Sequence, residues 1–334
     1  MKKIKQVYVC EKSLEMSISN IARMTLLFIL MAGTLNLRAE KYAGEIFKLG
    51  AGVRNFALGR TGLTDLDTPA KAYWNPALLE NQKNLQTEIM HAEDFNGNLK
   101  FDIASVNFKD KGLGLVISRI AIDDVKKTAL PNPDSLPSND NRPYAYKSIN
   151  NADYLIHIGM SRQINDKFSL GLSPKLVFRN LNEESAYGFG ADLGAYYSLN
   201  ESVRFGARFR DFFFTQMFYE NGSTQSVNPG LDLESSFVTK LPVFNKKTVF
   251  FVNSEINTEG IDEAATLSFG QFSIDWHAGM EITATDNIRL YSGYDVDSIN
   301  AGMSLMLKNF NFNYSFEHDS NLDNSHRVSV GVNI

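Results

Sequence analysis

Hydrophobic and polar residues alternate strictly over many short stretches of the chain. In the C-terminal stretch HRVSVGVNI (326–334), apolar residues occupy every second position. The stretches YGFGADLGAYYSL (187–199), VRFGARFR (203–210) and FNFNYSFE (310–317) show the same period. A period of two places apolar side chains on one face of a β-strand and polar side chains on the other. The pattern therefore predicts strands whose two faces meet different surroundings.

Fourteen stretches follow this pattern, with turn-forming residues between them. They lie at residues 84–93, 98–108, 112–122, 152–163, 168–179, 185–199, 202–211, 236–241, 247–256, 271–283, 287–294, 298–307, 310–318 and 326–334. Short connections at 109–112, 164–167, 200–202, 242–246, 284–287 and 308–309 alternate with connections that include the long polar stretches 123–151, 212–235 and 257–270.

This arrangement predicts an all-β fold, a transmembrane antiparallel β-barrel of about 14 strands over residues 84–334. Its apolar face meets lipid and its polar face meets the lumen. An exported soluble β-sandwich or propeller is the alternative, since it also buries an apolar face. The 13 Tyr and 24 Phe, many near strand ends, favour the barrel because aromatic residues form girdles at membrane interfaces. The alternating strand at the C-terminus also favours the barrel.

The first 39 residues read as a secretory signal peptide. Basic residues precede the apolar run MTLLFILMAGTL (24–35), and the small residue Ala39 follows. Twelve apolar residues are too few for a spanning helix, which needs roughly 20. We therefore expect residues 1–39 to be a cleaved export signal and the protein to lie in the outer membrane. An uncleaved N-terminal anchor is the alternative, and translation from Met16 or Met24 would shorten the leader.

Charge and cysteine content narrow the classes of function. Loss of the six basic and two acidic residues in 1–39 takes the formal net charge from −5 to −9. An acidic chain is a poor partner for nucleic acid. Cys10, the one cysteine, lies in the leader. The mature chain therefore has no disulfide, no cysteine metal site and no cysteine nucleophile.

Residues 40–83 precede the first strand and do not alternate. They are rich in glycine, which allows tight turns and close packing against other surfaces. We expect this segment to be a hatch that fills the lumen, because a barrel of this width would otherwise be open to water. Near its end stands YWNP (73–76). Pro76 fixes its own backbone and holds Asn75 extended, so no long helix or strand passes through.

The hatch carries a family signature. LGAGVRNFALGRTGLTDLDTPAKAYWNPALL (49–79) resembles the N-terminal signature of the PorV/PorQ family, which belongs to the FadL-like outer-membrane barrels. The signature residues among them are Gly52, Arg54, Leu58, Gly59, Ala72, Tyr73, Trp74, Asn75, Pro76 and Ala77. Leu78 replaces the usual glycine after Asn-Pro-Ala. The resemblance implies a barrel that either passes hydrophobic solutes or serves type IX secretion.

The motif is interpreted as the anchor of the hatch. Tyr73 and Trp74 are expected to wedge against the barrel wall, and Arg54 to pair with a lumenal carboxylate. A purely stabilising role, without gating or ligand contact, is the alternative.

Alternation also predicts a charged lumen. Opposite charges on inward faces are expected to form a network that joins strands and hatch, with a selectivity lining as the alternative. The predicted members are Asp153, Lys175, Arg179, Asp192, Arg204, Arg208, Arg210, Asp275, Glu281, Arg289, Glu317 and Arg327. His157 and His277 also fall on inward faces. No ligand-like spacing surrounds them, so no metal site is expected.

The sequence predicts neither an enzyme nor a cofactor. It holds no G-x-S-x-G, no H-E-x-x-H and no Gly-rich phosphate loop. A lipid hydrolase with separately placed Ser and His is the less favoured alternative.

Two non-enzymatic functions stay open. In one, the loop DFFFTQMFYE (211–220) collects hydrophobic small molecules at the outer face, because an exposed apolar loop is costly unless it binds something. In the other, this loop and the Pro-rich stretch 130–146 bind secretion-system proteins. The candidate residues of the loop are Phe212, Phe213, Phe214, Phe218 and Tyr219. The expected partners are outer-membrane lipid and either of these two classes, with both chain termini and the short turns facing the periplasm.

Overall fold

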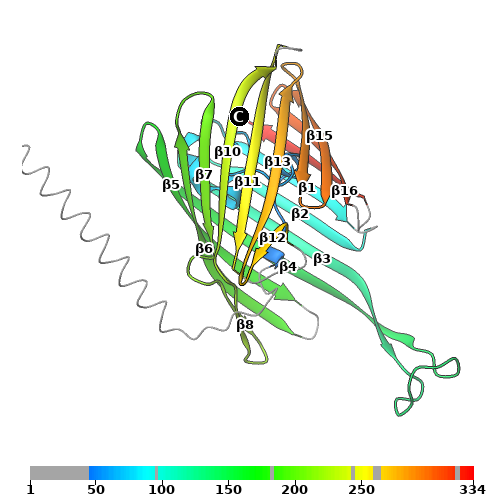
Figure 1. Cartoon of the computed structure of the whole chain (residues 1–334). Coiled ribbons are helices and arrows are strands. Elements are labelled where there is room, and N and C mark those ends of the chain that lie inside the picture. Colours follow the sequence, from blue (N-terminus) through cyan, green and yellow to red (C-terminus); the bar gives the residue numbers. More distant parts are fainter. Residues whose placement is uncertain (1–44, 95–96, 181–183, 242–244, 259–264, 320–323) are drawn as a thin grey trace, which may run out of the picture. The chain divides into compact units, whose positions relative to one another are not determined.

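One antiparallel sheet closes on itself around the N-terminal segment of the chain (Figure 1). The structure, a computed structural model, describes residues 45–94, 97–180, 184–241, 245–258, 265–319 and 324–334. All of these belong to the unit Ala39–Ile334. The predicted signal peptide, 1–39, lies outside the described residues. Among the helices of the described residues, none is long and apolar enough to cross a membrane.

Within the described residues, four short helices precede the strands. They are η1 (Glu45–Phe47), α2 (Val53–Ala57), α3 (Lys71–Trp74) and η2 (Pro76–Asn81). The strands are β1 (Gln86–Asp94), β2 (Leu99–Asn107), β3 (Leu113–Ala129), β4 (Tyr144–Asn165), β5 (Phe168–Asn180), β6 (Ser185–Ser198), β7 (Val203–Arg210), β8 (Gln216–Tyr219), β9 (Thr224–Ser226), β10 (Gly230–Leu241), β11 (Lys246–Asn257), β12 (Leu267–Phe269), β13 (Phe272–Thr283), β14 (Ile288–Asp295), β15 (Ser298–Leu307), β16 (Phe310–Asp319) and β17 (Ser325–Asn333).

Fourteen of these strands form the closed wall, as the sequence predicts. Each pairs antiparallel with its neighbour in the chain, from β1 through β7 and then β10, β11 and β13 to β17. Pairing of β1 with β17, from Gln86 opposite Asn333 to Glu93 opposite His326, closes the ring. Closure removes the unpaired edge that an open sheet would expose to lipid. The short strands β8, β9 and β12 are additions at one end of the wall.

The connections divide between the two ends of the wall as predicted. The short connections predicted from the sequence join strands at the end where the C-terminus lies, at the top of Figure 1. The hatch enters β1 at this same end, where Leu85 and Ile334 exchange backbone hydrogen bonds of 2.7 and 2.8 Å. The opposite end carries the long connections after β3 and β7. We call these the turn end and the loop end.

The long stretch 123–151 is not a loop for most of its length, and this prediction was wrong. β3 and β4 continue past the wall as a two-stranded hairpin that ends in residues 130–143, and Figure 1 shows it projecting from the loop end. Its residues are polar because a hairpin outside the membrane needs no apolar face. The hairpin strands therefore lack the alternation of apolar and polar residues by which strands were predicted.

The prediction for 212–235 was also wrong in part. The stretch contains β8 and β9, and β10 begins at Gly230 rather than at residue 236. The missed part of β10 reads GLDLES, in which Leu231 and Leu233 alternate with Asp232 and Glu234. The two acidic residues made the segment look like a loop, yet both are buried in the lumen.

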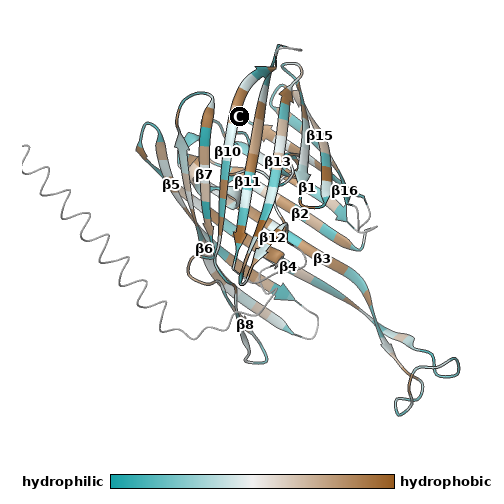
Figure 2. Ribbon diagram, viewed as in Figure 1, coloured by the Kyte–Doolittle hydropathy of each residue, from teal (hydrophilic) through white to brown (hydrophobic). Residues whose placement is uncertain are grey.

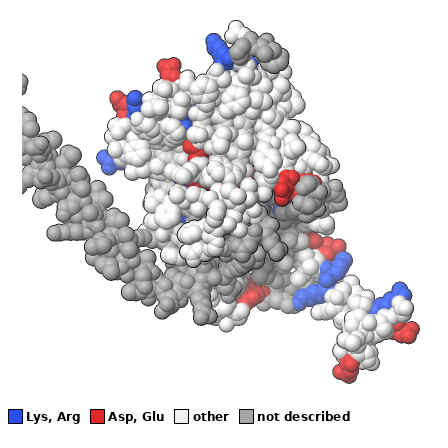
Figure 3. Space-filling model, in the orientation of Figure 1, with Lys and Arg blue, Asp and Glu red and all other residues white. Residues whose placement is uncertain are grey.

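The outer face of the wall is apolar. Ile89 is 71% exposed, and Val328, Val330 and Phe312 are among many apolar side chains that are similarly directed outward. Their inward neighbours are buried. Apolar and polar positions alternate along the ribbons in Figure 2. On the face seen in Figure 3, charged side chains gather at the two ends, including the projecting hairpin, and are sparse on the band between. This is the polarity that lipid and water impose on a membrane barrel.

The inner face is not polar throughout, in contrast to the prediction of a charged lumen. Inward residues of β1 to β5, among them Met90, Ile103, Val116, Leu155 and Val177, form one apolar cluster with the hatch. The described part of the hatch starts near the loop end, where Leu49 lies beside Asp94 and Leu99, and runs to β1 at the turn end. The lumen is therefore a packed protein core, and its inner positions are apolar where apolar hatch residues lie.

Candidate functional site

The hatch rests on glycines of the wall. A Cβ atom added to Gly171 of β5 would lie 2.4 Å from the backbone nitrogen of Ala77, and one added to Gly194 of β6 would lie 2.2 Å from Oδ1 of Asn75. On the other side, a Cβ at Gly293 of β14 would lie 2.1 Å from the nitrogen of Gly59. These approaches are possible only without a side chain. The wall is therefore shaped to hold the hatch backbone at two places.

The Asn-Pro element joins the hatch to β6. Asn75 Nδ2 donates to the carbonyl oxygens of Leu63, 2.8 Å away, and of Ala195 in β6, 2.9 Å away. Asn75 Oδ1 accepts from the nitrogen of Ala77 at 3.1 Å and caps η2, whose first residue is Pro76. Asn75 is extended, as the residue before proline must be. One side chain thus fixes two parts of the hatch and the wall.

Tyr73 and Trp74 bind the part of the hatch that lies near the loop end. The Tyr73 hydroxyl donates to the carbonyl of Phe47 at 2.8 Å and accepts from the nitrogen of Gly50 at 2.9 Å. Trp74 Nε1 donates to the carbonyl of Ala51 at 2.7 Å. Arg208 of β7 lies 5.2 Å from the Tyr73 ring and 5.6 Å from the Trp74 ring. The two aromatics therefore bind the hatch to itself and present their faces to a wall cation.

Arg54 lies between hatch and wall. Its guanidinium binds Asp65 of the hatch at 2.7 Å, Glu281 of β13, and the Tyr291 hydroxyl of β14 at 2.9 Å. Gly52, just before its helix, has φ 84°, which favours glycine. Arg289, also predicted for the network, lies 2.7 Å from Asp67 of the hatch. Arg54, which was predicted to pair with a lumenal carboxylate, thus binds one carboxylate of the wall and one of the hatch.

Glu234 of β10 makes a contact between wall and hatch that the sequence did not reveal. Its carboxylate accepts from the backbone nitrogens of Gly62 and Thr64, both at 2.8 Å, and from the Thr64 hydroxyl at 2.6 Å. Asn253 of β11 donates to it at 3.3 Å. Hydrogen bonds to a charged group are stronger than neutral ones. Glu234 lay in a stretch expected to be a loop, so no inward face was assigned to it.

A second cluster lies where the wall strand after β6 is interrupted. Lys175 of β5 lies 2.9 Å from Asp192 of β6 and 2.5 Å from Asp211, which follows β7. Asp211 has φ 53° and the chain leaves the sheet there before β8 resumes the pairing with β6. All three side chains are buried. Lys175 and Asp192, two predicted members of the network, are therefore joined by a third residue, Asp211, which holds the interruption in place.

The other predicted charges divide into paired and peripheral ones. Arg179 binds Asp153 at 2.9 Å, and Arg208 and Arg210 share Asp232 at 2.7 and 3.0 Å. Arg327 binds Glu317 at 2.6 Å.

Two predicted members lie at the ends of the wall instead. Arg204 lines a polar recess of about 200 Å³ at the turn end, and Asp275 accepts from the nitrogen of Thr266 at 3.0 Å near the loop end. Most of the predicted charges thus join strands, as expected for a structural network.

Buried polar groups also occur outside the predicted charge network. Lys71 of α3 is fully buried and donates to Gln82, and burial lowers its pKa to about 8. His157 lies with its ring centre 5.2 Å from that of Tyr73, and His277 has Nδ1 2.9 Å from Asp295. No group of three or more His, Cys, Asp or Glu side chains suited to a metal occurs among the described residues.

The aromatic loop is divided by the structure. Phe212 and Phe213 have ring centres 3.8 Å apart, and Phe218 stacks on Tyr187 at 5.5 Å and on Phe189 at 6.0 Å. Phe213, Tyr187 and Phe189 are each more than half exposed, on the outer face. Phe214 takes φ 57° at the turn into β8. These residues form an outer aromatic patch beside the interruption.

Tyr219, predicted for the same face, instead points to the interior. Its hydroxyl accepts from Arg179 at 3.2 Å and donates to Gln225 at 2.6 Å. In β8 it is the neighbour of Phe218, and alternation places the two on opposite faces.

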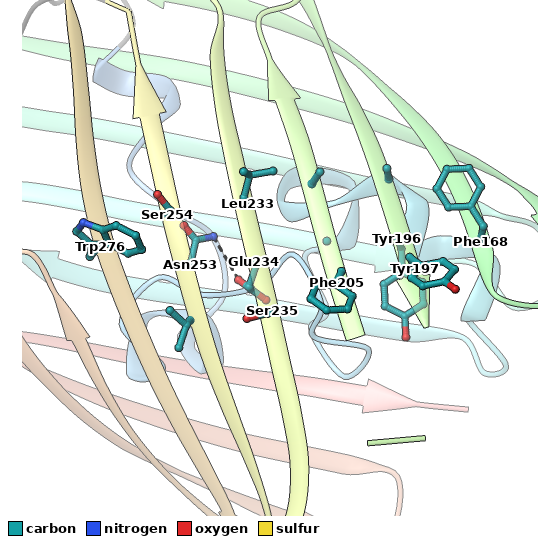
Figure 4. Close-up of a pocket in the computed structure, with 14 residues that line it drawn as sticks. Phe168, Tyr196, Tyr197, Phe205, Leu233, Glu234, Ser235, Asn253, Ser254 and Trp276 are labelled. Atoms are coloured by element: carbon teal, nitrogen blue, oxygen red, sulfur yellow. Dashed lines mark hydrogen bonds between the residues drawn. The ribbon is translucent and has the colours of Figure 1, made fainter. Parts of the chain in front are cut away.

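A hollow of about 460 Å³ lies in the outer surface over β6, β7, β10, β11 and β13 (Figure 4). Phe205, Leu233 and Trp276 line it and are 43–45% exposed. Glu234 and Asn253 line its buried side, and Figure 4 shows the hydrogen bond between them. The hollow therefore opens on the apolar face of the wall and is backed by the residues that hold the hatch.

A family model described as a membrane-bound beta-barrel domain, DUF5777, matches residues 85–284. The chain belongs to this family. The match starts at the residue before β1 and extends through β13, so it spans most of the wall and none of the hatch. No curated protein matches the chain.

Solved structures share the fold. The toluene transporter TbuX of Ralstonia pickettii is 12% identical, with a TM-score of 0.52 over 85% of this chain and 97% of its own. The toluene transporter TodX of Pseudomonas putida is 11% identical, with a TM-score of 0.54 over the same shares, 85% and 97%. At such identities the likeness shows the fold alone. Fold and family together show a membrane-bound β-barrel, whereas membership of the PorV/PorQ family stays a prediction.

Proposed function

We propose that this barrel of the DUF5777 family lets small hydrophobic molecules cross the outer membrane, and that it does so without catalysing a reaction. The observation that carries the proposal is the outer aromatic patch at the interruption between β7 and β8. Phe212, Phe213 and Phe218 lie there on the outer face, directly outside the buried charges that hold the interruption. Lipid accounts for apolar side chains over the outer face in general, and what distinguishes this patch is its place beside the break in strand pairing, where β6 changes its partner from β7 to β8.

The fold and the filled lumen support this proposal. Two solved barrels with the same fold are named as toluene transporters. Hatch residues from Gly50 to Leu79 are almost all buried against the wall, with Asp67 as the most exposed exception. A lumen packed in this way is poorly suited to bulk flow of water and ions, and apolar residues of hatch and wall line much of it.

Uptake in whole cells tests the proposal. Cells that express the protein should take up radiolabelled toluene faster than cells that lack it. Phe213→Ser and Phe218→Ser should lower this rate, whereas Phe272→Ser, another exposed aromatic on the outer face, should leave it unchanged. An uptake rate that does not depend on the protein contradicts the proposal.

A role in type IX secretion, of the PorV/PorQ kind, is the second candidate. The hatch signature and the β3–β4 hairpin support it. The hairpin extends past the wall, and Leu136, Tyr144 and Tyr146 on it are 52–86% exposed. A two-stranded hairpin has marginal stability by itself, so a protein partner would stabilise it. Removing residues 130–143 should then abolish co-purification of a partner from native membranes and leave toluene uptake intact.

Absence of catalysis has its own test. Purified protein should not hydrolyse phospholipid or p-nitrophenyl esters above the rate of a heat-denatured sample. Hydrolysis that is lost on denaturation would show an enzyme.

A further inference from the structure

A small cavity lies inside the wall at the loop end, between the hatch and the place where the ring closes. Its volume is about 120 Å³. Leu49 and Phe56 of the hatch and Leu99 and Phe101 of β2 form its apolar side. The rings of Phe56 and Phe101 meet edge to face, with centres 6.1 Å apart. A cavity of about 150 Å³ with similar apolar walls is large enough to bind benzene. The cavity thus has about the size of one aromatic ring.

The opposite side of the cavity is charged, and some of its buried polar atoms lack a hydrogen-bond partner. Arg327 of β17 lies over the Phe56 ring at 4.2 Å, binds Glu317 at 2.6 Å and reaches Asp94 of β1 at 3.2 Å. Arg327 is 3% exposed and Asp94 is 8% exposed. Within the described residues, Nε of Arg327 and Oδ1 of Asp94 have no hydrogen-bond partner. Buried polar atoms normally have partners, because an unpaired one costs about 1–3 kcal/mol.

The two unpaired atoms differ in kind. Arg327 Nε is a donor and Asp94 Oδ1 is an acceptor. The contact between the two side chains joins Nη2 of Arg327 to Oδ2 of Asp94 at 3.2 Å. One hydroxyl group beside this ion pair would therefore accept from Nε and donate to Oδ1. Water satisfies such atoms too, but it does not fill the apolar side of the cavity.

We propose that this cavity binds a monocyclic aromatic molecule that carries a hydroxyl group, that is, a phenol. The ring lies against Phe56, Phe101 and Leu99, and the hydroxyl lies between Arg327 and Asp94. The inference rests on the proposed passage of small hydrophobic molecules and names their class: phenols are preferred to plain hydrocarbons.

Binding to the full chain in lipid nanodiscs tests the proposal, with 4-fluorophenol and fluorobenzene as matched probes followed by ¹⁹F NMR. Empty nanodiscs correct for partition into lipid. One hydrogen bond to a charged group corresponds to at least about a tenfold difference in affinity, so 4-fluorophenol should bind at least about tenfold more tightly. Asp94→Leu should remove this preference. Leu99→Trp should fill the cavity and abolish binding of both probes, whereas Leu231→Trp, on the outer face of β10, should change neither.

The possible outcomes are distinct. Equal affinity for the two probes, or a preference that survives Asp94→Leu, overturns the proposal. Binding that survives Leu99→Trp places the ligand elsewhere and also overturns it. Should Asp94→Leu not fold, the wild-type preference and the loss with Leu99→Trp still decide. Binding as expected without uptake by cells would refute the proposed function and leave the site standing, whereas uptake without binding would do the reverse.

Discussion

Glu234→Gln should loosen the hatch while leaving the wall intact. The carboxylate of Glu234 accepts from two backbone nitrogens of the hatch, those of Gly62 and Thr64, each at 2.8 Å. Glutamine has almost the same shape but offers one oxygen and one NH₂ group. One of the two hatch nitrogens would then face a donor in place of an acceptor.

The size of the effect follows from these contacts. A hydrogen bond to a charged group contributes about 1.5–3 kcal/mol, and the substitution removes at least one. Each 1.4 kcal/mol is a factor of about ten in an equilibrium constant, so the segment around Gly62 should open about 10 to 100 times more often. The wall should remain folded, because its strands are held by their own ladder of backbone hydrogen bonds.

Cysteine labelling measures this opening. In a Cys10→Ser background the chain has no other thiol. Leu63→Cys, at a fully buried position next to Gly62, should react with a maleimide only when the segment opens, so its labelling rate reports the open fraction. Combining Leu63→Cys with Glu234→Gln should raise the rate about 10- to 100-fold.

Two controls make the result specific. Leu78→Cys, also fully buried but held by the Asn75 cap and the β5 and β6 glycines, should label at the same slow rate with or without Glu234→Gln. Glu201→Gln, in an exposed turn, should have no effect on Leu63→Cys. If Glu234→Gln leaves the Leu63→Cys rate unchanged, the carboxylate does not hold the hatch and the reasoning fails.

Three other predictions concern topology, membrane face and hatch. In intact cells Ser135→Cys on the hairpin should label and Glu201→Cys in a turn should not; the reverse would mean that the barrel is inverted. Val330→Asp should hinder stable insertion, at a cost below about 4 kcal/mol on the lipid face, and Ser329→Asp should be milder; an equal response would show that the register of β17 is wrong. Deleting the hatch should leave a folded barrel with much higher conductance in planar bilayers. Trp74→Ala, a packing loss of about 3–5 kcal/mol, should raise conductance less, and unchanged conductance in both would rule out a plug.

The strands of the wall could be predicted because lipid and lumen impose opposite demands on neighbouring residues. β17 shows this most clearly, since each of its outward positions from Val328 onward is apolar and its inward ones are polar or glycine. The alternation of apolar and polar residues is lost where the strands no longer lie between lipid and lumen. Beyond residue 122 the β3–β4 hairpin leaves the membrane, and its polar strands read as a loop. In β10 the inward Asp232 and Glu234 are buried and paired, which no local pattern can reveal.

The hatch motif could also be read from the sequence, because Asn-Pro has strong local preferences. Its partners could not. Gly171, Gly194 and Glu234 lie 96 to 159 positions along the chain from Asn75, and only the closure of the ring brings them to the hatch. The same holds for the cavity between Asp94 and Arg327, which come from the first and last strands of the wall. The sequence by itself determined the alternating wall and the position of the hatch along the chain. Ring closure alone decided which distant side chains meet around the hatch, because contacts across a lumen depend on register and strand order and leave no local periodicity.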